Sequence, residues 1–174
     1  MATENLRPNA NGDNSECLGS DSNSTDNYQL IDESSANDAD YVDANTTEAN
    51  WYLDLYNLPS TAIPAGSTIN KITIYGRLAE PLNGNDYGKF AYKSGGTTYY
   101  SSAPNVTTSL AEYSWEQTTN QKTSAAFTID EINALQIGVS LYQGTKGNGW
   151  GRCSQLWIVI DYTEPIGKQN IIIF

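Results

Sequence analysis

Apolar and polar residues alternate most clearly over residues 128–162, and we expect the rest of the chain to pack against this stretch. The apolar positions of its first strand are Leu135, Ile137, Val139 and Leu141. Its second strand repeats the pattern at Ser154, Leu156, Ile158, Ile160 and Tyr162. A period of two is typical of a strand with one buried face. The glycine-rich segment 144–151 between the two strands predicts that they form a hairpin.

The same alternation predicts further strands before this stretch. They cover residues 50–56, 69–79, 87–93, 97–101 and 106–117, with two short ones near 28–31 and 41–42. The segment Ser94-Gly95-Gly96 predicts a tight hairpin between two of them. Just before residue 135, Thr128 and Glu131 match the capping box of a short helical turn.

About eight strands separated by Gly, Pro and Asn turns, with almost no helix, predict an all-β protein. We expect an antiparallel two-sheet β-sandwich with jelly-roll-like winding, an extended acidic N-terminal arm and one short helical turn. The length of 174 residues suits one domain. Within it we expect residues 1–49 to form the acidic arm packing on the sandwich, 50–164 the sandwich core and 165–174 an apolar C-terminal tail.

Negative charge is concentrated at the start of the chain. The net charge is −11, and residues 1–50 hold 11 acidic residues against one basic residue, Arg7. Phosphate binding needs a basic surface, so we expect no nucleic-acid partner. The opening M-A-T-E-N-L-R-P lacks the pattern of a secretory signal, and no apolar run has the length of a membrane helix, so we expect no membrane partner.

The composition removes several kinds of catalysis. The chain has no histidine, which excludes Ser-His-Asp and Cys-His catalysis and histidine-based metal sites. No glycine-rich loop precedes a Lys-Ser or Lys-Thr pair, so a phosphate-binding loop is absent. Glu112 and Glu116 share a strand face, but four residues of strand separate them by roughly 13 Å, too far for a pair of glycosidase carboxyls. We therefore expect a protein that is not an enzyme.

Two groups of residues suggest ligand binding, each with an alternative structural interpretation. Asp38, Asp40 and Asp43 could supply oxygen ligands to a structural Ca²⁺, or they could simply form turns in a solvated loop. No other cofactor is expected. The aromatic residues Tyr99, Tyr100, Tyr113 and Trp115 could line a glycan-binding face, or they could be ordinary residues of strand faces.

The two cysteines, Cys17 and Cys153, are too few for a disulfide scaffold. Two interpretations stay open. Either a bridge ties the N-terminal arm to the last main strand, or both residues are buried thiols.

The end of the sequence and one loop residue predict contacts with other proteins. The residues Ile171, Ile172, Ile173 and Phe174 are four consecutive apolar side chains, which are unfavourable in water. We expect them to pair with a sheet edge of the same subunit or of a neighbour. Trp150, inside the loop G-N-G-W-G, is a further interface candidate because a Trp at a loop tip often marks a contact surface.

Several segments together resemble a known group of proteins. In chain order they are L-R-P-N-A-N-G-D, N-Y-Q-L-I-D-E, D-A-D-Y-V-D, L-D-L-Y-N-L-P, I-N-K-I-T-I-Y-G-R, A-L-Q-I-G-V-S-L and R-C-S-Q-L-W-I-V-I-D-Y. They are similar to β-sandwich virion structural proteins of tailed phages and related prokaryotic viruses. The resemblance implies a structural role on the particle, such as capsid decoration, a fibre or a tail part. It transfers no functional residues.

The sequence thus leads to one expected function and one alternative. We expect a non-enzymatic viral structural protein, a capsid decoration or other virion surface component. It would assemble in the host cytoplasm with other virion proteins and with copies of itself. The alternative is a carbohydrate-binding β-sandwich module that uses surface aromatics.

Overall fold

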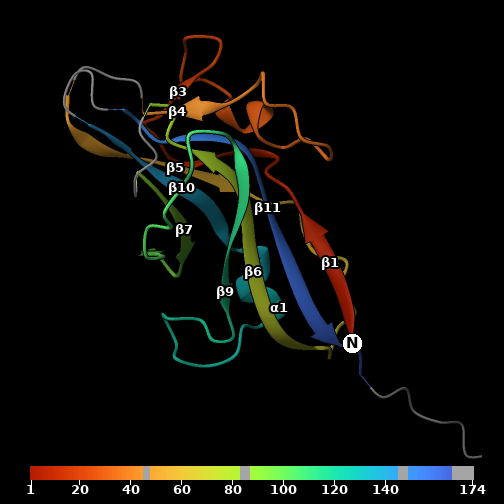
Figure 1. Ribbon diagram of the computed structural model, residues 1–174. Helices are drawn as coiled ribbons and strands as arrows, with labels where there is room; N and C mark the ends of the chain where they lie inside the picture. Colours follow the sequence, from red (N-terminus) through yellow and green to blue (C-terminus); the bar gives the residue numbers. More distant parts are fainter. Residues whose placement is uncertain (45–47, 83–86, 145–148, 166–174) are drawn as a thin grey trace, which may run out of the picture.

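The computed structural model describes residues 1–44, 48–82, 87–144 and 149–165 (Figure 1). Its elements in chain order are β1 (Ala2–Leu6), β2 (Ala10–Ser15), β3 (Leu18–Gly19), the 3₁₀ turn η1 (Asn27–Leu30), β4 (Val42–Asp43), β5 (Asn50–Asn57), β6 (Thr68–Ala79), β7 (Gly88–Ser94), β8 (Thr97–Tyr100), β9 (Ala111–Gln117), α1 (Ile129–Asn133), β10 (Gln136–Gln143) and β11 (Arg152–Thr163).

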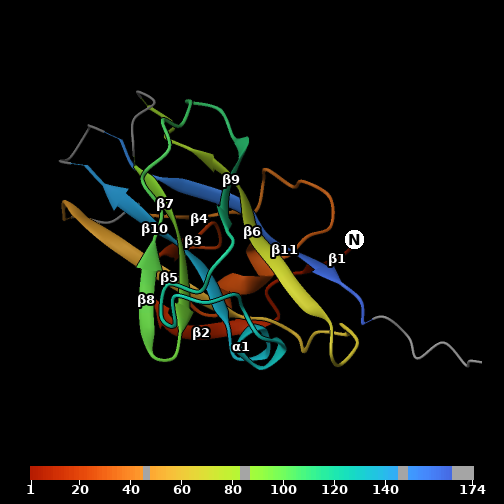
Figure 2. The same cartoon turned by 90° about the horizontal axis from the view of Figure 1, so that it is seen from below.

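The strands form two antiparallel sheets packed face to face. One sheet has the order β3-β4-β11-β6-β9, with β1 also paired to β11, and we call it sheet A. The other has the order β2-β5-β10-β7-β8, and we call it sheet B (Figure 2). From β4 to β11 the chain crosses repeatedly between the sheets and gives the orders β4-β11-β6-β9 and β5-β10-β7-β8. This is jelly-roll winding, so the predicted fold class is confirmed.

The two strands of residues 135–162 do not form the predicted hairpin. β10 pairs with β5 and β7 in sheet B, whereas β11 pairs with β4, β6 and β1 in sheet A. The segment that joins them therefore crosses from one sheet to the other. The alternation correctly marks the buried faces, because Ile137, Val139, Leu141, Leu156 and Ile158 are fully buried. It cannot distinguish strands that lie side by side from strands that face each other across a core.

The first 44 residues supply edge strands to both sheets. β1 pairs with the end of β11 in sheet A (Figure 1), and β2 pairs with β5 in sheet B (Figure 2). The predicted strand at 28–31 is wrong, since this segment is the 3₁₀ turn η1. The turn follows Asp26, which has a left-handed backbone with φ 58°, and Ile31 N–H bonds back to Tyr28 O at 3.3 Å. Only the Ile31 carbonyl makes a sheet-like contact, accepting from Leu156 N–H at 2.9 Å.

Other local predictions agree with the structure. The hairpin over residues 87–101 is β7 and β8, and Thr128 with Glu131 forms the capping box of α1. The predicted strand 106–117 is shorter than expected and begins at Ala111. Before it, the Thr107 carbonyl still accepts from the Glu80 N–H, just after β6, at 3.0 Å. The Thr107 N–H instead donates to the Tyr113 hydroxyl and its Oγ1 to Ser109 O, so these two groups are used locally and not in a sheet ladder.

Candidate functional site

Three of the four aromatic residues predicted to bind a glycan lie on the inner side of the sandwich. Tyr99, Tyr113 and Trp115 pack against the hydrophobic core. Tyr99 and Trp115 both contact the buried ring of Tyr92, with ring centroids at 5.2 and 5.3 Å. Tyr100, the neighbour of Tyr99, points to the opposite side of β8 and is 47% exposed. The structure therefore does not bring the four predicted residues onto one face.

Trp150 lies against the core and takes part in an ionic cluster. Its indole Nε1 donates to Asp43 Oδ2 at 3.1 Å. The same oxygen accepts from the Arg152 guanidinium at 2.9 Å, and that guanidinium stacks over the Tyr41 ring at 3.5 Å. These contacts give Trp150 a structural role within the subunit.

The three aspartates proposed as calcium ligands have separate partners. Asp38 accepts two bonds from Arg77, at 3.0 and 2.7 Å, and this hydrogen bonding holds the pKa of the Asp38 carboxyl below its ordinary value. Asp40 accepts from Asn37, and Asp43 from Trp150 and Arg152. Within the described ranges, no group of three or more His, Cys, Asp or Glu side chains is placed to hold a metal ion.

A buried polar cluster anchors the N-terminal segment to sheet B. Asp54 is fully buried and accepts four hydrogen bonds, from Glu16 N–H at 2.6 Å, Cys17 N–H at 2.8 Å, Asn27 Nδ2 at 2.7 Å and the Tyr56 hydroxyl at 2.8 Å. A buried carboxylate is stable only when its oxygens are bonded in this way.

Both cysteines are buried free thiols, in line with one of the two interpretations left open above. Burial raises the pKa of the Cys17 thiol well above its ordinary value, and the nearby Asp54 carboxylate raises it further. Burial likewise raises the pKa of Cys153 to about 12. The pKa of Tyr56 is raised well above its ordinary value by the same burial and by Asp54. Thiolates are the reactive form of cysteine, so neither thiol is poised for chemistry.

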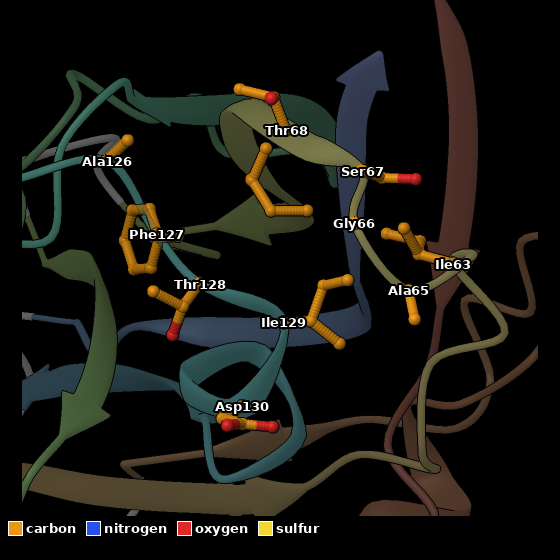
Figure 3. Close-up of a pocket in the computed structure, with 11 residues that line it drawn as sticks. Ile63, Ala65, Gly66, Ser67, Thr68, Ala126, Phe127, Thr128, Ile129 and Asp130 are labelled. Carbon is orange, nitrogen blue, oxygen red and sulfur yellow. The ribbon is translucent and has the colours of Figure 1, made fainter. Parts of the chain in front are cut away.

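An apolar recess lies where the chain enters β6 and α1. It has a volume of about 510 Å³ and is floored by the buried side chains of Ile63, Ile69 and Phe127. Figure 3 shows Phe127 and Ile63 on opposite sides of the recess with Ile129 between them. Gly66 forms part of its wall and lies next to Pro165, since a Cβ built on Gly66 would be 3.7 Å from the Pro165 Cβ. The predicted interface residues Ile171, Ile172, Ile173 and Phe174 lie outside the described residues.

A row of aromatic side chains crosses the outer face of sheet B, and the sequence analysis did not single it out. Trp51 of β5 lies directly opposite Tyr142 of β10, and their ring centroids are 5.2 Å apart. Tyr142 contacts Tyr87, just before β7, at 5.0 Å. The Lys89 ammonium lies 3.9 Å from the centroid of the Trp51 ring. We call the three rings, together with the lysine beside them, the aromatic row.

The sequence alone could not have located the aromatic row. On β5, Trp51, Leu53 and Leu55 alternate with Tyr52, Asp54 and Tyr56, so both faces carry large apolar side chains. The register with β10 decides between them, because Tyr52, Asp54 and Tyr56 lie opposite the buried Leu141, Val139 and Ile137. The other face, with Trp51, therefore points outward.

No helix in the described part of the chain combines the length and apolar character needed to cross a membrane.

Comparison with known proteins identifies no relative of this chain. No protein-family model and no curated protein matches the chain.

Proposed function

We propose that the protein is a non-enzymatic structural component of a viral particle, such as a capsid decoration protein, which acts by assembling with copies of itself and with other particle proteins. The observation that carries this proposal is the apolar recess next to Pro165. Its buried floor of Ile63, Ile69 and Phe127 is a site that apolar side chains can fill.

The occupant that we propose for the recess is the apolar segment Ile171–Phe174 of a neighbouring copy. In the sequence this segment begins six residues after Pro165, which adjoins the recess. Each CH₂ group transferred from water into such a site contributes about 0.8 kcal/mol. Contacts of this kind between identical subunits can close into a symmetric oligomer or continue along a particle surface.

The test is the oligomeric state of the full chain and of a variant that lacks residues 171–174, measured by sedimentation velocity. We expect the full chain to form a defined oligomer and the truncated chain to be mostly monomeric. Ile129→Glu, which places a charge in the recess, should have the same effect. Leu82→Glu alters an exposed apolar residue outside the recess and serves as the matched control. Identical size distributions for all four proteins would overturn the proposal.

The alternative function is a carbohydrate-binding module. Tyr99, Tyr113 and Trp115 pack on the core, so we do not place a sugar site on them. The observation that favours sugar binding is the aromatic row on the other side of sheet B. A glycan array tests this second function, which assembly through the recess does not by itself require.

A further inference from the structure

We propose that the aromatic row on sheet B is a binding site for an oligosaccharide that carries a carboxylated sugar. Trp51, Tyr142 and Tyr87 would contact the sugar rings, and Lys89 would pair with the carboxylate. This inference goes beyond the proposed assembly function and uses different residues. The recess adjoins α1, just before β10 begins, whereas Tyr142 lies at the far end of β10. The two sites can therefore be tested separately.

The register of sheet B places the three rings side by side. Trp51 and Tyr142 are paired residues on adjacent strands, and the Tyr142 N–H bonds to Tyr87 O on the other side at 2.8 Å. Rings on three neighbouring chain segments thus form one continuous row across the sheet. Neighbouring rings are inclined to each other by 50° and 68°, so each ring offers its own apolar edge or face to a sugar ring and the row is not one flat surface.

The row lies on the outer face of sheet B, where its rings and Lys89 are half-buried. None of the three rings is among the residues that pack against the hydrophobic core. Figures 1 and 2 show no described helix or strand forming a third layer outside sheet B. Cross-strand aromatic pairs do stabilise sheets, and this effect accounts for the ring contacts. Lys89 in turn packs over Trp51 in a cation–π contact, which leaves its ammonium group without an ion-pair partner among the described residues.

Lys89 supplies the charge that defines the ligand. Its ammonium group lies over Trp51, yet it forms no ion pair with any carboxylate in the described residues. Lys93, four residues after Lys89 on the same outer face of β7, is paired with Asp13. An unpaired ammonium beside aromatic rings matches a ligand with both an anionic group and apolar faces, and a carboxylated sugar has both. A nucleic acid does not fit, because each of its nucleotides carries a phosphate, whereas Lys89 is a single cation and the neighbouring Lys93 is already paired with Asp13.

The test is isothermal titration calorimetry of the full chain with four probes. These are an oligogalacturonate, its carboxyl-reduced neutral counterpart, sialyllactose and lactose. Binding of either acidic probe more tightly than its neutral counterpart is expected, and the two acidic arms distinguish a uronic acid from a sialic acid. If neither acidic probe binds at millimolar concentration, or if each binds no better than its neutral counterpart, the proposal is overturned.

Variants assign the binding to these residues. Trp51→Ala should weaken binding about tenfold or more, as is typical when a stacking ring is removed. Lys89→Gln should remove the preference for the acidic probe, a change of about three- to fivefold, while the neutral probe is unaffected. Trp157→Ala removes a ring on the outer face of sheet A that also lies beneath a cation, Arg7, and should leave binding unchanged.

Two outcomes of the variant series would contradict the assignment. One is binding that survives both Trp51→Ala and Tyr142→Ala. The other is a loss of sugar binding in Trp157→Ala as large as that in Trp51→Ala. Truncation of residues 171–174 should leave sugar binding intact, so failure of the assembly proposal and failure of the sugar site give different results.

Discussion

The outer faces of the two sheets both carry aromatic rings and basic side chains, but the basic side chains have different partners. On sheet A, Tyr75 and Trp157 stack almost parallel, with centroids 5.2 Å apart and an interplanar angle of 8°, and Arg7 lies 5.3 Å above Trp157. The cations of that face have partners within the chain, such as Lys71 with Glu116 and Arg77 with Asp38. On sheet B the rings are tilted and Lys89 has only a ring beside it among the described residues.

The comparison shows that aromatic content does not identify a binding face by itself. On sheet A the rings stack on each other and the cations form ion pairs within the chain, so a ligand would add few new contacts. On sheet B the Lys89 ammonium has no ion-pair partner among the described residues, and under our proposal the carboxylate of a ligand supplies that partner. The three predictions below test this difference.

The largest effect is expected at Asp54, the fully buried carboxyl on the inward face of β5. Asp54→Ala would remove the acceptor of the buried Tyr56 hydroxyl and of the Cys17 N–H. Asn27 Nδ2 and the Glu16 N–H would lose one bond each but keep Cys17 O and Leu53 O as acceptors. We expect unfolding by urea to show a loss of about 3–5 kcal/mol. Trp51→Ala, on the other face of the same strand, should cost about 1 kcal/mol.

The opposite order of stability losses would contradict the assignment of the two faces of β5. If Trp51→Ala destabilised the protein much more than Asp54→Ala, Trp51 would be the buried residue and the aromatic row would not lie on the surface.

An intermediate effect is expected from alkaline pH, which tests the interior behind sheet B. The pKa values of Cys17 and Tyr56 are raised well above their ordinary values by burial, and that of Cys153 is raised to about 12. The folded state therefore keeps protons that the unfolded chain releases above about pH 9. Stability is present in full below that pH and should fall by about 2 kcal/mol or more between pH 8 and pH 11.

Urea titrations at several pH values measure this loss. Cys153→Ala should reduce the slope above pH 9, because one buried thiol no longer has to stay protonated. Tyr100→Phe removes a surface tyrosine and should leave the slope unchanged. A stability that stays flat up to pH 11 would show that these groups are not buried in the folded protein.

The smallest effect is expected when single cations are removed from the two outer faces. Arg77→Gln breaks the two-bond contact with Asp38 and removes a further bond to Leu110 O, so a loss of about 1 kcal/mol is expected on sheet A. Lys89→Gln breaks no ion pair in the described structure and should change stability by less than about 0.5 kcal/mol. Thermal unfolding at low and high salt measures both. Equal, salt-dependent losses for the two variants would mean that Lys89 has an ionic partner in the chain.

Local pattern by itself determined much of the fold. The alternation at residues 135–141 and 154–160 specified the buried faces of β10 and β11, because one face of each strand is apolar at every inward position. Thr128 and Glu131 specified the start of α1, and Ser94-Gly95-Gly96 specified the turn between β7 and β8, because both motifs act within a few residues. Eight or so strands with little helix also led to the two-sheet sandwich.

Tertiary structure alone decided how β5 is oriented and where β10 and β11 lie. Both faces of β5 carry large apolar side chains, and its inward Asp54 is tolerated only because Glu16, Cys17 and Asn27, far away in the sequence, bring hydrogen-bond donors to it. Likewise, β10 and β11 would show the same alternation as neighbours in one sheet or as partners across the core. Side-chain period reports that a face is buried but not which distant element buries it, and the candidate sugar site on the outer face of sheet B depends on that second fact.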